Sequence, residues 1–156
     1  GRGVHKRYKN KNLYESLSAY GVGFHRHNAE IDQVLKKFTN KKFEFSFTPH
    51  LSPMFRGILS TIYIDLEKNI SQSKVLKELT RFYKKENFVK ILKPDSLLST
   101  NDVINTNDCH ISVCKSKYSN KIIILSAIDN LIKGGAGQAV QNLNNKFNFP
   151  ERTALK

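Results

Sequence analysis

Hydrophobic and polar residues alternate along the chain with two periods, one typical of helices and one of strands. The apolar positions of residues 31–38 are spaced at i, i+3, i+4 and i+7, as on one face of an amphipathic helix. Asn28 is the predicted N-cap of this helix, because its short side chain can accept a hydrogen bond from the first turn. Glu30 and Asp32 would follow in the first turn, where the helix dipole favours negative charge.

Two stretches have the alternation of a strand. In KKFEFSFT, residues 41–48, Phe43, Phe45 and Phe47 occupy every second position, which predicts a half-buried strand. A polar bend with two prolines separates it from GILSTIYIDL, residues 57–66, whose alternation predicts a second strand. We expect these two strands to pair antiparallel.

The remaining segments continue this mixture of helices and strands. In order, they predict a helix over residues 75–83 that begins near Ser71 or Ser73, a short strand over residues 88–92 closed by Pro94, a strand pair over residues 110–117 and 121–126, and a long helix from residue 130 with a glycine-rich opening. The sum is an α+β domain in which helices cover a mixed or antiparallel sheet.

Length and composition restrict the class of protein. With 156 residues, 39% of them hydrophobic, the chain can bury the core of one ordinary domain. No apolar run approaches the roughly 20 residues that span a bilayer, and the basic residues 1–12, an expected flexible lead-in, are not followed by the apolar region of a signal peptide. Cys109 and Cys114 form neither a disulfide framework nor a metal-ligand pattern. We therefore expect a cytoplasmic protein with no membrane span and no metal site.

The net charge of +13 makes nucleic acid a candidate partner, because a positive field of this size attracts phosphate groups. The lysines, however, are scattered with asparagine through many polar stretches rather than gathered in one stripe. This distribution favours a compositional bias, and nucleic-acid binding is the less favoured interpretation.

GFHRHNAEI, residues 23–31, concentrates proton-handling and anion-binding groups directly before the predicted helix. An imidazole at this place can act as a general acid or base near neutral pH. His25 and His27 are two positions apart. If the segment is extended, their rings therefore lie on the same side of the backbone. A single histidine is more often structural or merely exposed, so these two become catalytic candidates only if other functional groups meet them.

Two further stretches offer anion-binding groups. In FTPHLSPMFRGI, residues 47–58, two prolines stiffen a loop that could hold Arg56 in the orientation needed to capture a carboxylate or phosphate. A solvated arginine in a proline-rich turn is the alternative. In DNLIKGGAGQAVQNLN, Gly134, Gly135 and Gly137 open a helix, where anions and cofactors bind. Tight helix packing is the alternative there, and the glycine spacing is not a dinucleotide fingerprint.

Four separated motifs and a tail, in register, resemble one known family. YGVGFHRHNAEI, FTPHLSPMFRGI, RFYKKENFVKIL and SAIDNLIKGGAGQAVQNLN, with the tail NFPERTAL, are similar to N-acetyl-γ-glutamyl-phosphate reductase, the NADP-dependent enzyme of arginine biosynthesis. The match runs from about residue 1 to the end. The sequence departs from the family at Asn28 and Ala29, where threonine and proline are usual, and in GGAG, where GAAG or GASG is commoner.

The resemblance implies a mechanism and a division of the protein. In the family a cysteine thiolate attacks the acyl phosphate, phosphate leaves, and NADPH delivers hydride to the thioester to give the semialdehyde. This sequence contains neither that cysteine's motif nor the glycine-rich nucleotide loop, and Cys109 and Cys114 do not match the nucleophile. The chain therefore resembles the C-terminal domain alone, which implies that the nucleophile lies upstream and that this chain by itself is inactive.

The resemblance also implies roles for particular residues. His25 or His27 would take the proton of the thiol, and the sequence does not separate the two roles. The implied substrate-binding residues are Arg26, Arg56 and Tyr20, and the implied cofactor contacts, near the nicotinamide of an NADP bound mainly by the other domain, are Gly135, Gln138 and Asn142.

The implied fold is a mixed sheet with helices packed on one face, like the C-terminal domain of glyceraldehyde-3-phosphate dehydrogenase. Residues 13–128 would form the substrate-binding and subunit-contact domain, and residues 129–156 would return to the nucleotide-binding domain. The implied partners are the acyl phosphate substrate, that nucleotide-binding domain and further copies of the chain. Two alternatives stay open: a noncatalytic scaffold or dimerisation domain of the same fold, and an aspartate-semialdehyde dehydrogenase-like domain, which the HRH and FTPHLSPM motifs disfavour.

Overall fold

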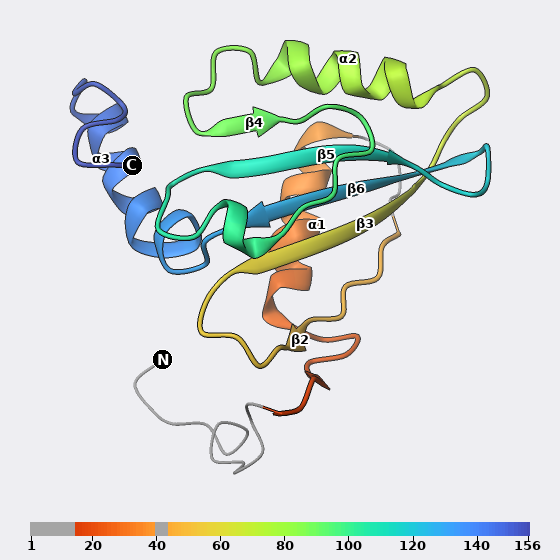
Figure 1. Ribbon diagram of the computed structural model, residues 1–156, viewed down its shortest axis with the longest axis horizontal. Coiled ribbons are helices and arrows are strands. Elements are labelled where there is room, and N and C mark those ends of the chain that lie inside the picture. The colour runs from red at the N-terminus through yellow and green to blue at the C-terminus, as the bar shows by residue number, and fades with distance from the viewer. Residues whose placement is uncertain (1–14, 40–43) are drawn as a thin grey trace. The chain divides into compact units, whose positions relative to one another are not determined.

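The computed structural model describes residues 15–39 and 44–156, which form two compact units, one ending at Phe55 and one beginning at Arg56. The first unit contains helix α1 (Arg26–Phe38) and a short antiparallel pair of strands, β1 (Ser18–Ala19) and β2 (His50–Leu51). The second unit contains a four-stranded sheet and the remaining helices (Figure 1).

The sheet of the second unit is mixed. Its strand order is β3–β6–β5–β4, in which β3 (Ile58–Asp65), β6 (Lys121–Ile128) and β5 (Cys109–Lys115) are antiparallel neighbours and β4 (Val89–Ile91) runs parallel to β5. The four strands predicted from residue 57 onward are therefore confirmed. The α+β class with a mixed sheet is confirmed as well.

The predicted strand at residues 41–48 is wrong where the structure describes it. Residues 44–48 form no strand, and Phe43 lies outside the described residues. Phe45 and Phe47 are nevertheless half-buried and alternate with exposed neighbours. The alternation shows which side chains are buried. An extended segment can bury every second side chain without forming backbone hydrogen bonds to a neighbouring strand.

The expected pairing of that segment with residues 57–66 is also wrong, because β3 pairs with β6 instead. The register places Ile62 opposite Ile124 and Ile64 opposite Ile122. Cross-strand pairs of β-branched residues stabilise a sheet, and Ile58 opposite Ile128 is a third such pair at the other end of β3.

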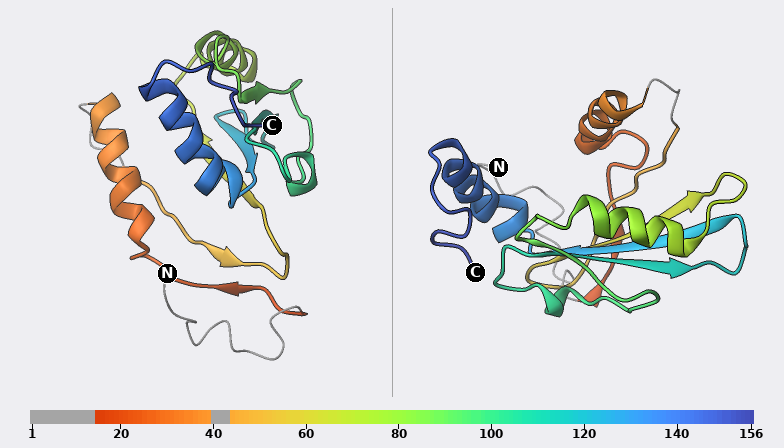
Figure 2. Two further views of the ribbon diagram at one scale, coloured as in Figure 1. Left: turned by 90° about the vertical axis from the view of Figure 1, so that its left-hand side faces the viewer. Right: turned by 90° about the horizontal axis from the view of Figure 1, so that it is seen from above.

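Helix α2 (Gln72–Phe82) begins at one of the two predicted places: Ser71 is its N-cap, and Oγ of Ser71 accepts a hydrogen bond from the backbone N–H of Lys74 at 3.3 Å. Figures 1 and 2 show the helix lying along one face of the sheet, where it contacts β4 and β5. A 3₁₀ turn (Thr100–Asp102) contacts β6.

The core of the second unit surrounds the two central strands. Val113 and Ile122 are buried on one face of the sheet, and Ser112 and Ala127 are buried on the other. Phe88 and Val103, which lie outside the strands, are the other buried apolar side chains of the described residues. Both faces of β5 and β6 are therefore covered.

The predicted C-terminal helix consists of two consecutive pieces. A π-helical segment (Ile132–Ala136) leads into α3 (Gly137–Lys146), and Gly135 near their junction has φ −151° and ψ −108°, outside the helical region. In Figure 2, α3 lies beyond the end of the sheet rather than on its face. Segments of π-helix are rare and often occur at functional sites.

Candidate active site

The two candidate imidazoles lie together at the N-terminus of α1. His25 is the N-cap: its backbone is extended (φ −65°, ψ 143°), and its Nδ1 accepts a hydrogen bond from the backbone N–H of His27 at 3.3 Å. The two rings meet edge to face with their centroids 4.6 Å apart. Because Nδ1 accepts in this arrangement, the neutral His25 ring has its proton on Nε2.

The predicted N-cap at Asn28 is wrong, because the cap lies three residues earlier. Asn28 is inside the first turn, where its N–H donates to the carbonyl oxygen of His25 at 2.9 Å, and no acidic residue lies in that turn, so Glu30 and Asp32 follow it. The segment is extended only at His25, so the rings do not meet through the alternation of an extended backbone. His27 is helical, and the cap brings its ring to His25.

Two aromatic rings flank the imidazole pair. The ring of Tyr20 lies 5.3 Å from that of His25, and the ring of Phe47 lies 5.6 Å from His25 and 6.1 Å from His27. The β1–β2 pair holds these segments together, with the N–H of Tyr20 donating to the carbonyl of Pro49 at 3.0 Å. Tyr20 is therefore beside the imidazoles, and Phe47 is a neighbour whose only signal in the sequence was its alternating burial.

Arg56 is held in the second unit by two polar side chains. Its Nε lies 3.2 Å from Oδ2 of Asp129, and its Nη1 donates to Oδ1 of Asn105 at 2.5 Å. The side chain of Arg56 is 18% exposed and that of Asp129 is fully buried. The next residue, Gly57, donates its N–H to Oδ1 of Asn130 at 2.6 Å. The start of β3 is thus bound to the residues that follow β6.

Asp129 is the buried centre of this arrangement, and sequence reasoning did not assign it. Its Oδ2 also accepts the N–H of Asn105 at 2.9 Å, and its Oδ1 accepts the N–H groups of Leu131 and Ile132 at 2.8 and 3.0 Å. Burial opposes ionisation of this carboxyl, but the three backbone N–H groups and Arg56 outweigh it and lower the pKa of Asp129. Asp129 is therefore an ionised partner for the guanidinium of Arg56.

The predicted cofactor contacts lie where the π-helical segment leads into α3. Gln138 Nε2 donates to Asn142 Oδ1 at 2.9 Å, so the two amides share one side of the helix. Gly135 is exposed, and an added Cβ there would meet only the carbonyl oxygen of Asn130, at an ordinary 3.5 Å.

The neighbouring Gly137 differs from Gly135 in the room around it. It is buried, and an added Cβ would lie 2.4 Å from Oδ1 of Asn107 and 2.6 Å from Cγ2 of Ile132. Packing within the chain explains the missing side chain at Gly137, whereas packing would leave room for a Cβ at Gly135.

A buried polar cluster beside α3 was not predicted. Oε1 of Gln141 accepts from Asn107 Nδ2 at 2.9 Å and from Lys133 Nζ at 2.8 Å, and its Nε2 donates to Glu151 at 2.7 Å. Burial lowers the pKa of Lys133, whose Nζ lies 5.4 Å from the centroid of the Phe88 ring. The cluster fixes the C-terminal tail against α3.

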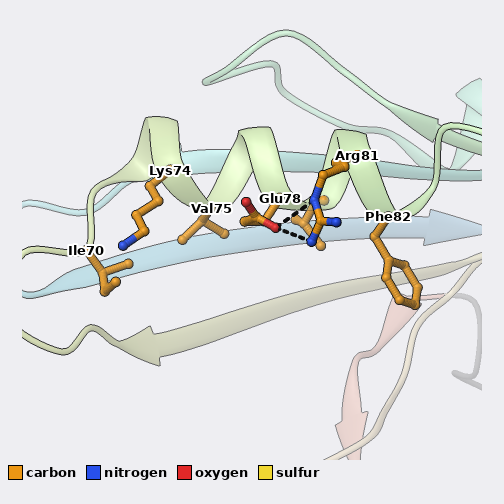
Figure 3. A pocket seen from close by; sticks show the side chains of 7 residues that line it. Ile70, Lys74, Val75, Glu78, Arg81 and Phe82 are labelled. Carbon is orange, nitrogen blue, oxygen red and sulfur yellow. Dashed lines mark hydrogen bonds and ion pairs between the residues drawn. The ribbon is translucent and has the colours of Figure 1, made fainter.

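An open hollow of about 340 Å³ lies along α2 (Figure 3). Its lining is mainly apolar, with an ion pair of 2.7 Å between Arg81 and Glu78 at α2. The lining residues are Ile70, Lys74, Val75, Glu78, Leu79, Arg81 and Phe82. None of them is a predicted site residue, and they include no pair of groups suited to proton transfer. We do not place the active site there.

The candidate residues are divided between the two units. Tyr20, His25 and His27 lie together in the first, and Arg26, the first residue of α1, is exposed beside them. Arg56 and the three cofactor candidates belong to the second. That the imidazoles and Arg56 belong to one substrate site is implied by the family resemblance and stays a prediction. Across residues 15–39 and 44–156 we find no group of three or more His, Cys, Asp or Glu side chains suited to a metal ion, and no helix long and apolar enough to span a membrane.

The mixed sheet and its covering helix define an α+β fold, and the chain carries a pair of imidazoles at the start of α1. Comparison with protein families gives its class: residues 1–130 match the family described as "Semialdehyde dehydrogenase, dimerisation domain". The chain belongs to this family.

Individual relatives are more specific. The chain is 49% identical over 141 residues to N-acetyl-γ-glutamyl-phosphate reductase of Thermoanaerobacter pseudethanolicus, and the aligned region covers 90% of this chain and 41% of that protein. It is 45% identical over 155 residues to the reductase of Desulforamulus reducens (99% and 45% covered). It is 43% identical over 159 residues to the probable chloroplastic reductase of Arabidopsis thaliana (99% and 39%). The predicted resemblance is confirmed, and the chain spans less than half the length of these relatives.

Proposed function

We propose that this chain is the substrate-binding and subunit-contact domain of an NADP-dependent N-acetyl-γ-glutamyl-phosphate reductase, and that it supplies the acid–base histidines. One observation carries the proposal: His25 and His27 hold their rings 4.6 Å apart at the N-terminus of a helix, with His25 capping it. The identity of 49% to a protein of that name supports the substrate class.

The cap favours different roles for the two imidazoles. While Nδ1 of His25 accepts the N–H of His27, its Nε2 bears the proton, so that nitrogen donates. His25 is therefore suited to give a hydrogen bond to an oxygen that gains negative charge. His27 is then the base that takes the proton of the attacking thiol, which raises the fraction of reactive thiolate.

Arginine and tyrosine side chains would hold the substrate's anionic groups. Arg26 is exposed at the N-terminus of α1, where the helix dipole also attracts anions. Tyr20 lies against His25. Arg56 would bind a carboxylate or the departing phosphate from the second unit.

Residues at the start of α3 fit a contact with a dinucleotide. Gly135 is exposed and has no side chain where packing in this chain would allow one, and Gln138 and Asn142 present amides from the same helix. When bound, NADPH supplies the hydride that reduces the acyl group. The role of this chain is to contact the cofactor, while the other domain of the protein binds most of it.

Reconstitution tests the proposal. The chain is mixed with the separately produced nucleotide-binding half of a relative, and NADPH oxidation is followed with N-acetylglutamyl phosphate and, as the matched control, aspartyl phosphate. Turnover of the first substrate only supports the proposal. Turnover of aspartyl phosphate would assign the chain to the aspartate-semialdehyde class, and complex formation without turnover of either would make it a scaffold.

A subunit-contact role is the second part of the proposal, and the edge strand β3 supports it. Among the described residues, β3 pairs with one strand only, β6. β3 also exposes Leu59 and Tyr63 on one face of the sheet and Ile62 on the other. We expect a dimer or larger assembly in sedimentation equilibrium, weakened at least tenfold by Tyr63→Glu. A monomeric wild-type chain at high micromolar concentration would contradict this role.

A further inference from the structure

We propose that Asp129, together with Asn105, is a positioning residue: it fixes the guanidinium of Arg56 and joins it to the start of the C-terminal helix. The functional meaning of this inference rests on the proposed function, in which Arg56 binds an anionic group of the substrate. The positioning itself is a property of this chain and can be measured without substrate.

The two contacts to Arg56 restrict its guanidinium in different directions. Nη1 donates to Asn105 Oδ1 at 2.5 Å, and the buried Nε lies 3.2 Å from Asp129 Oδ2 in an ion pair that lacks the alignment of a hydrogen bond. A guanidinium is planar, so a hydrogen bond at one nitrogen and an ion pair at another restrict its rotation about the side chain. Less rotational freedom then has to be lost when an anion binds, which is the benefit of preorganisation.

The exposure of the two partners favours positioning over a purely structural ion pair. Asp129 is fully buried and its carboxylate is already satisfied by three backbone N–H groups, so burial of the charge does not by itself require Arg56. Arg56 keeps 18% of its side chain exposed. One part of the arginine is fixed to the interior, and another part remains accessible.

Asn105 has a backbone conformation that its contacts compensate. Its φ of 62° lies in the left-handed region, which is uncommon for residues other than glycine. In this conformation its N–H donates to Asp129 Oδ2 and its Oδ1 accepts from Arg56. The same residue therefore completes both sides of the Asp129–Arg56 pair.

The other oxygen of Asp129 reaches the segment that leads to the cofactor candidates. Oδ1 accepts the N–H groups of Leu131 and Ile132, where the π-helical segment begins. The adjacent Asn130 accepts the N–H of Gly57, next to Arg56. One buried carboxylate thus fixes a proposed substrate contact and the start of the helix that carries the proposed cofactor contacts.

Side-chain NMR of this chain tests the positioning directly. The Nε–H signal of Arg56, assigned by its loss in Arg56→Lys, should show the heteronuclear NOE of a rigid group and slow exchange with water. In Asn105→Gly, which keeps the left-handed backbone and removes one acceptor, exchange should become about tenfold faster. Asp129→Asn should have the larger effect, and Asn105→Gly keeps the test valid if Asp129→Asn does not fold.

Asn69→Gly is the matched control. Asn69 also has a positive φ, of 69°, and lies in the exposed turn before α2. This substitution should leave the Arg56 signal unchanged. An Arg56 signal that is equally rigid in the wild type and in Asn105→Gly, or already mobile in the wild type, would overturn the inference.

A double-mutant cycle in the reconstituted reductase tests the functional part. Asn105→Gly and Arg56→Gln should each raise KM for the acyl phosphate by about tenfold or more with a smaller change in kcat, and the double variant should be no worse than Arg56→Gln alone. Additive losses would show that Asn105 acts elsewhere. An unchanged KM in Arg56→Gln would refute the proposed role of Arg56 in substrate binding, while the NMR result would still decide whether Asn105 and Asp129 position it.

Discussion

At the scale of single residues, His25 has two functions that use different ring nitrogens. Its Nδ1 is a hydrogen-bond acceptor for the first turn of α1, and its Nε2–H is the proposed hydrogen-bond donor to the substrate. A proton added at Nδ1 would remove the cap, because a protonated nitrogen cannot accept. Substitution by a residue that caps without titrating separates the two functions.

Asparagine at position 25 should preserve the helix and remove the chemistry. We expect His25→Ala to reduce the stability of α1 by about 1 kcal/mol through loss of the cap, whereas His25→Asn should keep the wild-type helicity by circular dichroism. Both variants should lose at least 100-fold in kcat in the reconstituted assay. Wild-type turnover by His25→Asn would mean that His25 is a cap only.

The glycines of the C-terminal segment should respond to alanine according to the room around each. Gly137→Ala should lower the free energy of unfolding by about 1–3 kcal/mol, because its Cβ would collide with Asn107 and Ile132. Gly134→Ala is the control, since its Cβ would meet nothing closer than 3.5 Å. Urea denaturation of the two variants and the wild type checks this, and equal stability of the two variants would contradict it.

The residues of the site could be predicted from sequence only where they belong to one contiguous motif. His25, His27 and Tyr20 are close in sequence, and the structure brings them together. Asn105 and Asp129 meet Arg56 across 49 and 73 positions respectively, and no local pattern marks either as its partner. Gly134, Gly135 and Gly137 look alike in sequence, and only their surroundings separate the packing glycine from the exposed ones.

At the scale of elements, the spacing of hydrophobic residues identified the helices and strands that bury one face against the rest of the protein. The helix after Ser71 and the strands of the sheet were predicted close to their bounds. The prediction of a strand at residues 41–48 was wrong because alternating burial does not show which backbone groups a segment hydrogen-bonds. The isoleucine pairs of β3 are formed with β6 instead. The start of α1 was misplaced because histidine is an unusual N-cap, whereas Asn28 has the usual chemistry of one.

The cap of α2 gives a prediction at this scale. Ser71→Ala should lower the free energy of unfolding by about 1 kcal/mol, because Oγ of Ser71 satisfies the N–H of Lys74 at the helix start. Ser71→Asn should restore most of that loss. Urea denaturation checks both variants, and an alanine variant as stable as the wild type would show that solvent satisfies the first turn equally well.

At the scale of the whole molecule, burial in the fold and neighbouring charges together decide the protonation of His110. His110 on β5 lies near Lys90 and Asp108, with its Nε2 3.9 Å from Asp108 Oδ2, while Lys90 Nζ binds the same carboxylate oxygen at 2.5 Å. Burial, followed by the charge of Lys90, lowers the pKa of His110 below its ordinary value, although Asp108 and Asp102 oppose the shift. The folded chain therefore favours the neutral ring.

This shift gives a stability that depends on pH with a definite sign. A histidine whose pKa is lower in the folded chain binds fewer protons there than in the unfolded chain, so its contribution to stability is present above the unfolded pKa of about 6.5 and is lost as pH falls through the folded pKa. We expect the free energy of unfolding to decrease from pH 7 to pH 5, and less so in His110→Gln, which retains polarity without titrating. The wild type and the His110→Gln variant share the other four of the five histidines. The difference between their pH dependences of unfolding free energy, measured by urea denaturation, therefore isolates His110. Equal pH dependences would contradict the prediction. They would mean that the attraction of Asp108 for a protonated His110 ring cancels the effects of burial and of the charge on Lys90.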